Sequence, residues 1–230
     1  MGLFAISSLA ATQYRKIGFA PNRISPFGYF VEGTFLGRDA LQGDGDEESR
    51  AGAIAFFGGT QRRKGLRVLL AAMSDVGTSE RLLRLHVYGP GVSPEMQAGQ
   101  EGVAYRGAIP FGEVPRRIKG YAAVVVPSTF DGWGVIVNEA IAAGVPVICS
   151  DAVGAHSVVA KYQCGVVYKS GDVPSLANAL RRISSDIEWR MGLADNTQAA
   201  AEALKPAVAA RVLADVIKSG ATVESNSPWY

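Results

Sequence analysis

The sequence contains little cysteine, little histidine and almost no net charge. Among its 230 residues are two cysteines and two histidines, and 23 basic side chains stand against 21 acidic ones, for a formal charge of +2. Two cysteines without partner spacing cannot build a disulfide framework or a zinc site, so we expect a reducing, cytoplasmic setting. The small net charge disfavours nucleic acid as a partner, because that partner requires a basic surface.

Long apolar runs and metal-binding clusters are also missing. The first stretch, MGLFAISSLAATQYRK, has an apolar part that precedes its positive charges, and it is too short to span a membrane. We therefore expect no export signal and no transmembrane segment, and at most a peripheral contact with the inner face of a membrane. His86 and His156 have no neighbours at ligand spacing, so we expect a core and a surface residue and no metal site.

Short apolar runs alternate with longer amphipathic segments from Ala53 onward. This alternation is typical of βαβ units and predicts an α/β fold, a Rossmann-like parallel sheet with flanking helices. The expected strands are residues 53–58, 83–89, 103–107, 122–128, 145–150 and 164–169. The expected helices are residues 65–75, 113–120, 134–143, 155–160, 173–185, 187–204 and 207–218.

A glycine-rich turn with three cations follows the first of these strands. In FFGGTQRRKGLRVLLAAM the strand ends at Gly58 and Gly59, and a helix begins near Lys64. Glycine lets the backbone approach a ligand, a helix start offers free N–H groups, and Arg63 and Lys64 add positive charge. The turn suits a phosphate or diphosphate, although a solvated basic turn would have the same composition.

A second glycine-containing helix start occurs in STFDGWGVIVNEAIAAGVPV. Gly132 and Gly134 leave the backbone open at the carboxyl end of a predicted parallel strand, where ligands bind in such sheets. Asp131 lies just before the helix, where it can face a ligand or, as Asp commonly does, cap the helix. Both roles are open from the sequence.

Glu139 lies inside the same predicted helix, among valine, isoleucine and alanine residues. An unpaired buried carboxylate would cost several kcal/mol, so Glu139 needs a partner. A sugar or ribose diol, an internal ion pair and solvent on the outer helix face are the three alternatives.

Taken in order, these segments, together with LHVYGPG, VAYRGAIPFGEVP and GAHSVV, resemble the C-terminal half of glycosyltransferase family 4, the retaining GT-B enzymes also called group 1 glycosyltransferases. The resemblance covers about residues 51–220 and is most specific at Asp131 and Glu139. It implies a hexosyltransferase domain that takes a nucleotide-diphosphate sugar as its substrate, needs no cofactor and transfers the glycosyl group to an acceptor hydroxyl with retention, as in polysaccharide biosynthesis.

The resemblance also implies residue roles. Lys64 would contact the diphosphate, Asp131 the sugar hydroxyls and Glu139 the ribose, and these three are the expected catalytic residues. Further donor contacts would come from the glycine turn, its cation, the backbone near the base and the helix start: Gly58, Gly59, Arg63, Gly107, Ile109, Gly132, Gly134, Val135 and Ile136. Two departures stand out, since family members usually have Glu in place of Asp131 and often Arg in place of Gly59.

Family members have an N-terminal acceptor-binding domain, of which the resemblance finds only a remnant here. The implied organisation is a remnant helix and linker over 1–50, the donor-binding domain over 51–203, a crossover helix over 204–220 and a flexible tail over 221–230. The acceptor domain would then be missing or on another chain, and an exposed apolar stripe on the last helix would favour a homo-oligomer. The alternative is a non-catalytic sugar-nucleotide-binding or interaction module; an epimerase or phosphorylase is disfavoured, because its essential residues are not found.

Overall fold

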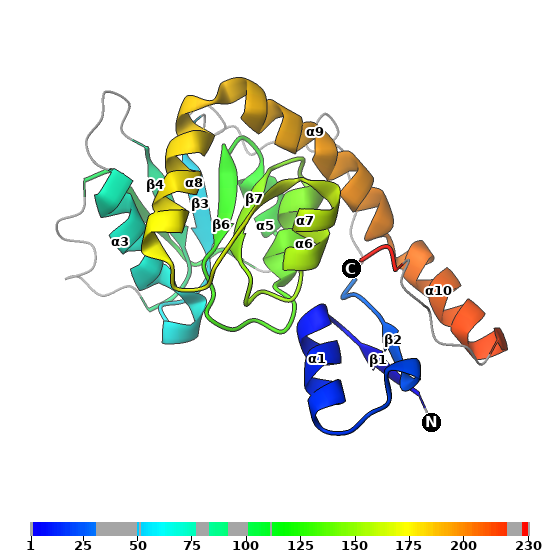
Figure 1. The fold of residues 1–230 in the computed structure, drawn as a ribbon. Coiled ribbons are helices and arrows are strands. Elements are labelled where there is room, and N and C mark those ends of the chain that lie inside the picture. The colour runs from blue at the N-terminus through cyan, green and yellow to red at the C-terminus, as the bar shows by residue number, and fades with distance from the viewer. Residues whose placement is uncertain are drawn as a thin grey trace.

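A parallel sheet with helices on both faces forms the centre of the chain (Figure 1). The computed structural model describes residues 2–30, 50, 52–76, 83–91, 101–110, 112–219 and 227–229. The six strands lie in the order β5-β4-β3-β6-β7-β8 and all pair in parallel. They are β3 Ile54–Phe57, β4 Leu85–Tyr88, β5 Val103–Gly107, β6 Ala123–Val126, β7 Val147–Ser150 and β8 Gly165–Tyr168. The predicted α/β, Rossmann-like fold is confirmed.

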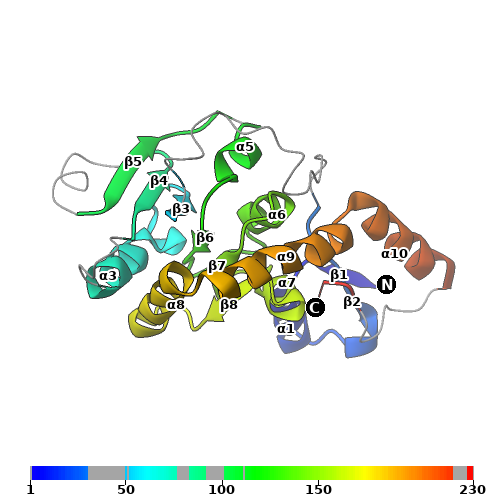
Figure 2. The same cartoon turned by 90° about the horizontal axis from the view of Figure 1, so that it is seen from above.

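The central strands are almost entirely apolar, as expected where helices cover both faces of the sheet. All four residues of β6, and likewise of β7, are buried. One face packs against α3 Leu66–Val76 and α8 Val173–Ser185. The other face packs against α5 Val114–Ile118, α6 Val135–Ala142 and α7 His156–Tyr162. Helix α9, Ile187–Ala203, crosses from α8 to α6 and α7 (Figure 2).

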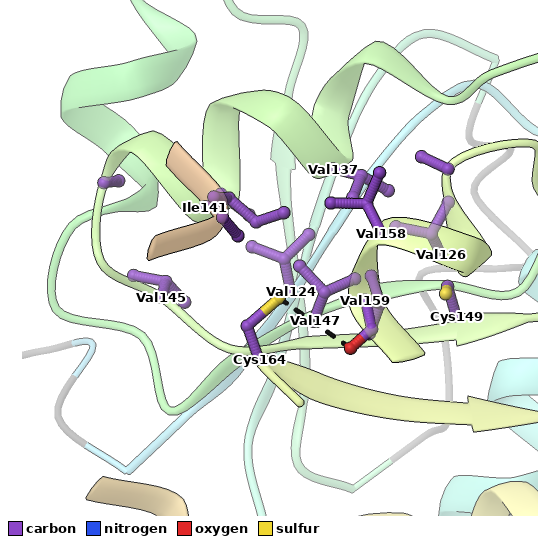
Figure 3. Close-up of a cluster of buried hydrophobic side chains, with 14 of the residues drawn as sticks. Val124, Val126, Val137, Ile141, Val145, Val147, Cys149, Val158, Val159 and Cys164 are labelled. Carbon is purple, nitrogen blue, oxygen red and sulfur yellow. Dashed lines mark hydrogen bonds between the residues drawn. The ribbon is translucent and has the colours of Figure 1, made fainter. Parts of the chain in front are cut away.

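β-Branched side chains fill the core under α6 and α7. Val124 and Val147 on the sheet meet Val137 and Ile141 of α6 (Figure 3). Their stiff side chains suit a pleated surface and interdigitate with little rotamer entropy to lose. Both cysteines, Cys149 and Cys164, are buried here as free thiols, which burial keeps in the protonated form by raising each pKa.

A small separate unit precedes the sheet. It contains β1 Leu3–Ala5, α1 Ser8–Lys16, a 3₁₀ turn over Pro21–Arg23 and β2 Ile24–Pro26, with β1 and β2 paired in parallel. Helix α1 begins at Ser8 because Ser7 caps it, accepting a hydrogen bond from the Ala10 N–H at 3.1 Å. Most of the predicted linker, residues 31–49, lies outside the described residues.

The C-terminal helix α10, Pro206–Ser219, extends toward this small unit (Figures 1 and 2). The prediction of a flexible tail over 221–230 is wrong at Trp229, which is fully buried. The Trp229 ring packs edge-on against Phe27 and Phe30, and its indole N–H donates to the Ala203 carbonyl at 2.9 Å. A large ring with a satisfied N–H supplies enough burial to hold a short segment in place. Residues 220–226 and 230 lie outside the described residues.

Candidate donor-binding site

Two loops meet where the central strands of the sheet end. Strands β3 and β6 are neighbours, but the chain leaves β3 toward α3 on one face and leaves β6 toward α6 on the other. Such a reversal opens a crevice at the carboxyl edge of a parallel sheet, where ligands bind. The basic turn follows β3 and the glycine-containing helix start follows β6, so the fold brings both predicted segments to this crevice.

The two loops are joined through their backbones. The Thr129 N–H donates to the Arg63 carbonyl at 2.8 Å. Gly65 has a φ of 73°, and a side chain there would lie 1.8 Å from the Pro127 carbonyl oxygen. Only glycine permits both the conformation and the close approach. The basic turn itself is a 3₁₀ turn over Arg62–Lys64. Helix α3 starts at Leu66, two residues after the predicted start near Lys64.

Lys64 and Asp131 form an ion pair between the two loops. Lys64 Nζ lies 2.8 Å from Asp131 Oδ2, and the two side chains are 26% and 15% exposed. Helix α6 has Gly134 at its N-cap and no side-chain cap, so the interpretation of Asp131 as a helix cap is wrong. Its carboxylate pairs with the lysine instead.

The start of α6 has no side-chain cap and lies beside this pair. Gly134 has a φ of 87°, and a side chain on it would lie 2.7 Å from Val153 Cγ1. The N–H groups of Val135 and Ile136 lie in the first turn, where no preceding helical carbonyl can accept them. With the helix dipole, these N–H groups place partial positive charge next to the Lys64–Asp131 pair.

The Glu139 side chain is half-buried on α6, and its carboxyl group has no hydrogen bond or ion pair within the part of the chain that the structure describes. Burial raises its pKa from 4.5 to about 7. Within the described residues, therefore, neither the internal ion pair nor full exposure on the outer face is observed. A ligand, and the solvent that reaches this half-buried side chain, are the partners left open.

The glycine turn differs in detail from its prediction. The Gly58 N–H donates to the Tyr88 carbonyl at 2.8 Å, within the sheet edge. Gly59 is buried, and a side chain there would lie 2.6 Å from the amide oxygen of Gln61. The Gln61 amide thus occupies the space next to Gly59. Arg63, expected to add charge at the diphosphate, has an exposed side chain.

Two predicted backbone contacts, Gly107 and Ile109, lie at the end of β5. Gly107 is exposed with a φ of 76°, and its carbonyl accepts the Gly89 N–H at 2.8 Å. Ile109 is partly buried against the core. Gly132 is exposed next to Asp131, and its carbonyl touches the backbone of Gly154.

Comparison with known proteins identifies the family. The family model for Glycosyl transferases group 1 matches residues 51–186. The chain belongs to this family. Among curated relatives, it is 29% identical over 141 residues to a putative teichuronic acid biosynthesis glycosyltransferase of Bacillus subtilis. It is 35% identical over 128 residues to the D-inositol 3-phosphate glycosyltransferase of Segniliparus rotundus. These matches cover 61% and 51% of this chain.

Solved structures share the fold of this group 1 glycosyltransferase chain. The Anabaena HepE structure in complex with UDP superposes with a TM-score of 0.78 at 17% identity, covering 95% of this chain and 64% of that one. WaaG, a glycosyltransferase involved in lipopolysaccharide biosynthesis, gives 0.71 at 18% identity, covering 87% of this chain and 58% of that one. The resemblance to group 1 glycosyltransferases is confirmed, and the solved structures share the fold. The chain spans 35% and 28% of the lengths of the two curated relatives.

Sequence reasoning missed two polar networks that support the site of this group 1 chain. The fully buried Asn138 accepts the Trp133 indole N–H at 2.7 Å and donates to the Tyr29 carbonyl at 2.8 Å, which ties the segment after β2 to α6. A polar residue next to Glu139 in an apolar helix was the available signal.

The second network lies in the sheet. The Tyr121 hydroxyl is 2.7 Å from His86 Nδ1 and 2.8 Å from the Tyr88 hydroxyl, and Phe57 stacks on Tyr88. His86 is thus buried, as expected, and His156, expected at the surface, is half-buried at the start of α7. His86 and Tyr88 are two positions apart in one strand and so lie on the same face of the sheet, which was the available signal in the sequence.

Two surface hollows lie away from the crevice. One of about 290 Å³ lies between the loops that precede β6 and β7 and the start of α9, at the opposite edge of the sheet. Another of about 450 Å³ runs along β8, α8 and Trp189. Within the described residues, no group of His, Cys, Asp or Glu is arranged to hold a metal, and no helix has the length and hydropathy of a membrane span.

Proposed function

We propose that this chain binds a nucleotide-diphosphate sugar at the crevice between β3 and β6 and supplies the donor-binding part of a retaining glycosyl transfer to an acceptor hydroxyl. The observation that carries the proposal is the position of Lys64, held by Asp131 beside the uncapped start of α6. Glu139, a half-buried carboxylate without a partner among the described residues, lies on the same helix.

Each group has one role in this proposal. The Lys64 ammonium and the first N–H groups of α6 hold the diphosphate, because both present positive charge to one point. Glu139 accepts hydrogen bonds from the two ribose hydroxyls, and Asp131 accepts them from the sugar. The backbone at Gly107 to Ile109 lies beside the base.

The chemistry follows from where charge develops. As the glycosidic bond breaks, the sugar gains oxocarbenium character and the diphosphate gains negative charge. Lys64 and the helix start are fixed before the reaction, so they stabilise the leaving group without reorganising. The acceptor hydroxyl then attacks from the side on which the diphosphate departs and gives its proton to the departing diphosphate oxygen, which retains the anomeric configuration.

The acceptor side of the cleft belongs to a further domain in this proposal. A sheet of two strands, such as β1 with β2, is marginal by itself. Ile6 and Ile17 of this unit are 41% and 71% exposed, and Ile217 of α10 is 71% exposed, as expected of an apolar stripe. We propose that an acceptor-binding domain, on this polypeptide or another, packs here, in the cytoplasm or at the inner face of a membrane, and that without it the chain self-associates.

A thermal-shift panel with UDP, GDP, ADP and their sugars tests donor binding. A ligand at a hundredfold excess over its dissociation constant stabilises the folded chain by about 2.7 kcal/mol. We expect a shift in the wild type that is lost in Lys64→Ala and Glu139→Ala. Lys169→Ala is the matched control, since this lysine also pairs with an aspartate but is 78% exposed. Equal shifts in the wild type and both site variants would refute the assignment.

The second candidate is a binding module without catalysis. It is favoured by Gly59, because family members often have an arginine at this position and here the Gln61 amide occupies the adjacent space. The two functions differ in turnover. Release of free nucleoside diphosphate from a bound sugar nucleotide, measured with an acceptor domain added, supports the transferase; tight binding with no release under any pairing supports the module.

A further inference from the structure

The ion pair at the crevice uses the ammonium that the proposed function assigns to the diphosphate. Lys64 Nζ lies 2.8 Å from Asp131 Oδ2, and the Asp131 side chain is only 15% exposed. A diphosphate that approaches Lys64 must therefore either share the ammonium with a carboxylate or take it away. In both cases two negative groups lie close to each other, at a cost that partial burial increases.

The Asp131 carboxylate has little freedom to move aside. The Asp131 N–H donates to the Ala152 carbonyl at 3.0 Å, and its carbonyl accepts the Gly154 N–H at 2.9 Å. Gly154 also packs directly on the Gly132 carbonyl, where a side chain would lie 2.0 Å away. With its backbone held on both sides and a short side chain, Asp131 stays beside the diphosphate whatever Lys64 does.

A sugar nucleotide and a free nucleoside diphosphate would interact differently with the Asp131 carboxylate. A sugar nucleotide brings sugar hydroxyls, which can donate to Asp131 and replace the ammonium that the diphosphate takes. A free nucleoside diphosphate brings no such donors, and its terminal phosphate carries more negative charge than the esterified one. The free diphosphate therefore leaves Asp131 without a full partner and adds repulsion, and each of these effects weakens its binding.

We propose that Asp131 is a specificity-determining residue, which makes the site prefer an intact sugar nucleotide to the free nucleoside diphosphate that the transfer releases. This inference rests on the proposed function. It gives the Lys64–Asp131 pair a role in the cycle: Asp131 competes with the product for Lys64 and so promotes its release, whereas the sugar of the substrate relieves the competition.

Calorimetric titration of the full chain with UDP, UDP-glucose, GDP and GDP-mannose tests the inference. Asp131→Asn removes the charge and keeps an acceptor for Lys64. We expect this variant to bind the free diphosphate about tenfold more tightly, a change on the order of one close charge–charge contact in a solvated site. Binding of the matching sugar nucleotide should stay equal or weaken. The preference for the sugar nucleotide therefore falls by about tenfold or more.

Asp151→Asn is the matched control. Asp151 follows β7 at the same edge of the sheet and also pairs with a lysine, Lys169, at 3.1 Å. Its loss changes the general electrostatic field by the same charge, so we expect any change in affinity to be equal for the diphosphate and its sugar. If Asp131→Asn does not fold at the assay temperature, Asp131→Ala repeats the comparison.

Three outcomes decide the question. An unchanged preference in the Asp131 variants, or weaker binding of the free diphosphate, overturns the inference; the second result would make Asp131 a positioning residue for Lys64. In both cases the proposed function survives if Lys64→Ala still abolishes binding. A wild-type chain that binds none of the four ligands refutes the proposed function, and the inference with it.

Discussion

Glu139 offers a direct test of the site in the absence of any ligand. Burial raises its pKa from 4.5 to about 7, so between these pH values the folded chain holds a proton that the unfolded chain has released. Stability is therefore lost as the pH rises from about 4.5 to above 7. Glutamine has the same shape and no charge, so Glu139→Gln should be free of this loss.

The size of the effect follows from the two pKa values. The interval between 4.5 and about 7 corresponds to an upper limit of roughly 3 kcal/mol. Because the side chain is half-buried, solvent screening reduces this figure, and we expect Glu139→Gln to be more stable than the wild type by about 1–2 kcal/mol at pH 8.5. At pH 5 the two proteins should differ little. For a domain of this size the gain corresponds to about 2–8 °C in the unfolding midpoint.

Thermal unfolding at pH 5 and pH 8.5, followed by circular dichroism, measures the difference. Glu101→Gln is the control, since Glu101 is exposed and its loss removes the same formal charge. A difference between Glu139→Gln and wild type that is equal at both pH values would refute the reasoning, as would a less stable variant at pH 8.5. A gain in stability together with weaker nucleotide binding is the signature of a carboxylate retained for a ligand.

Three further substitutions test the structure around the site. Asn138→Leu leaves the Trp133 indole N–H buried without an acceptor, and should lower the free energy of unfolding in urea by about 1–3 kcal/mol; an unchanged midpoint would contradict the contact. Trp229→Ala removes a fully buried ring and should cost about 3–5 kcal/mol in the same assay, whereas a loss near zero would mean the C-terminal segment is not packed. Gly134→Ala forces a side chain into a φ of 87° and should cost at least about 1–2 kcal/mol, while Gly132→Ala, with open space around it, should change the thermal midpoint little; equal effects would disprove the strain.

The order of strands and helices could be predicted from the sequence because it depends on local patterns. Apolar runs bounded by glycine and proline gave β5 within the same limits, 103–107, and α8 within the same limits, 173–185. The small unit at the start was harder. Strand β1 is three residues long and becomes a strand only by pairing with β2, a contact that no local period indicates.

The candidate site divides in the same way. The sequence by itself determined that two glycine-containing loops, one basic and one with Asp131, would each follow a parallel strand and precede a helix, because turn chemistry and side-chain periodicity are local properties. Only the tertiary structure decided that these loops lie side by side, because the order of strands in the sheet places β3 next to β6.

Three further features also depended on the packing. Lys64 and Asp131 are 67 positions apart, and their contact gives Asp131 a partner in place of a capping role. The raised pKa of Glu139 reflects how closely its surroundings exclude water, and the burial of Trp229 reflects aromatic rings brought from the other end of the chain. Desolvation and long-range contacts both depend on which residues surround a side chain in the folded protein, and the sequence alone does not specify those neighbours.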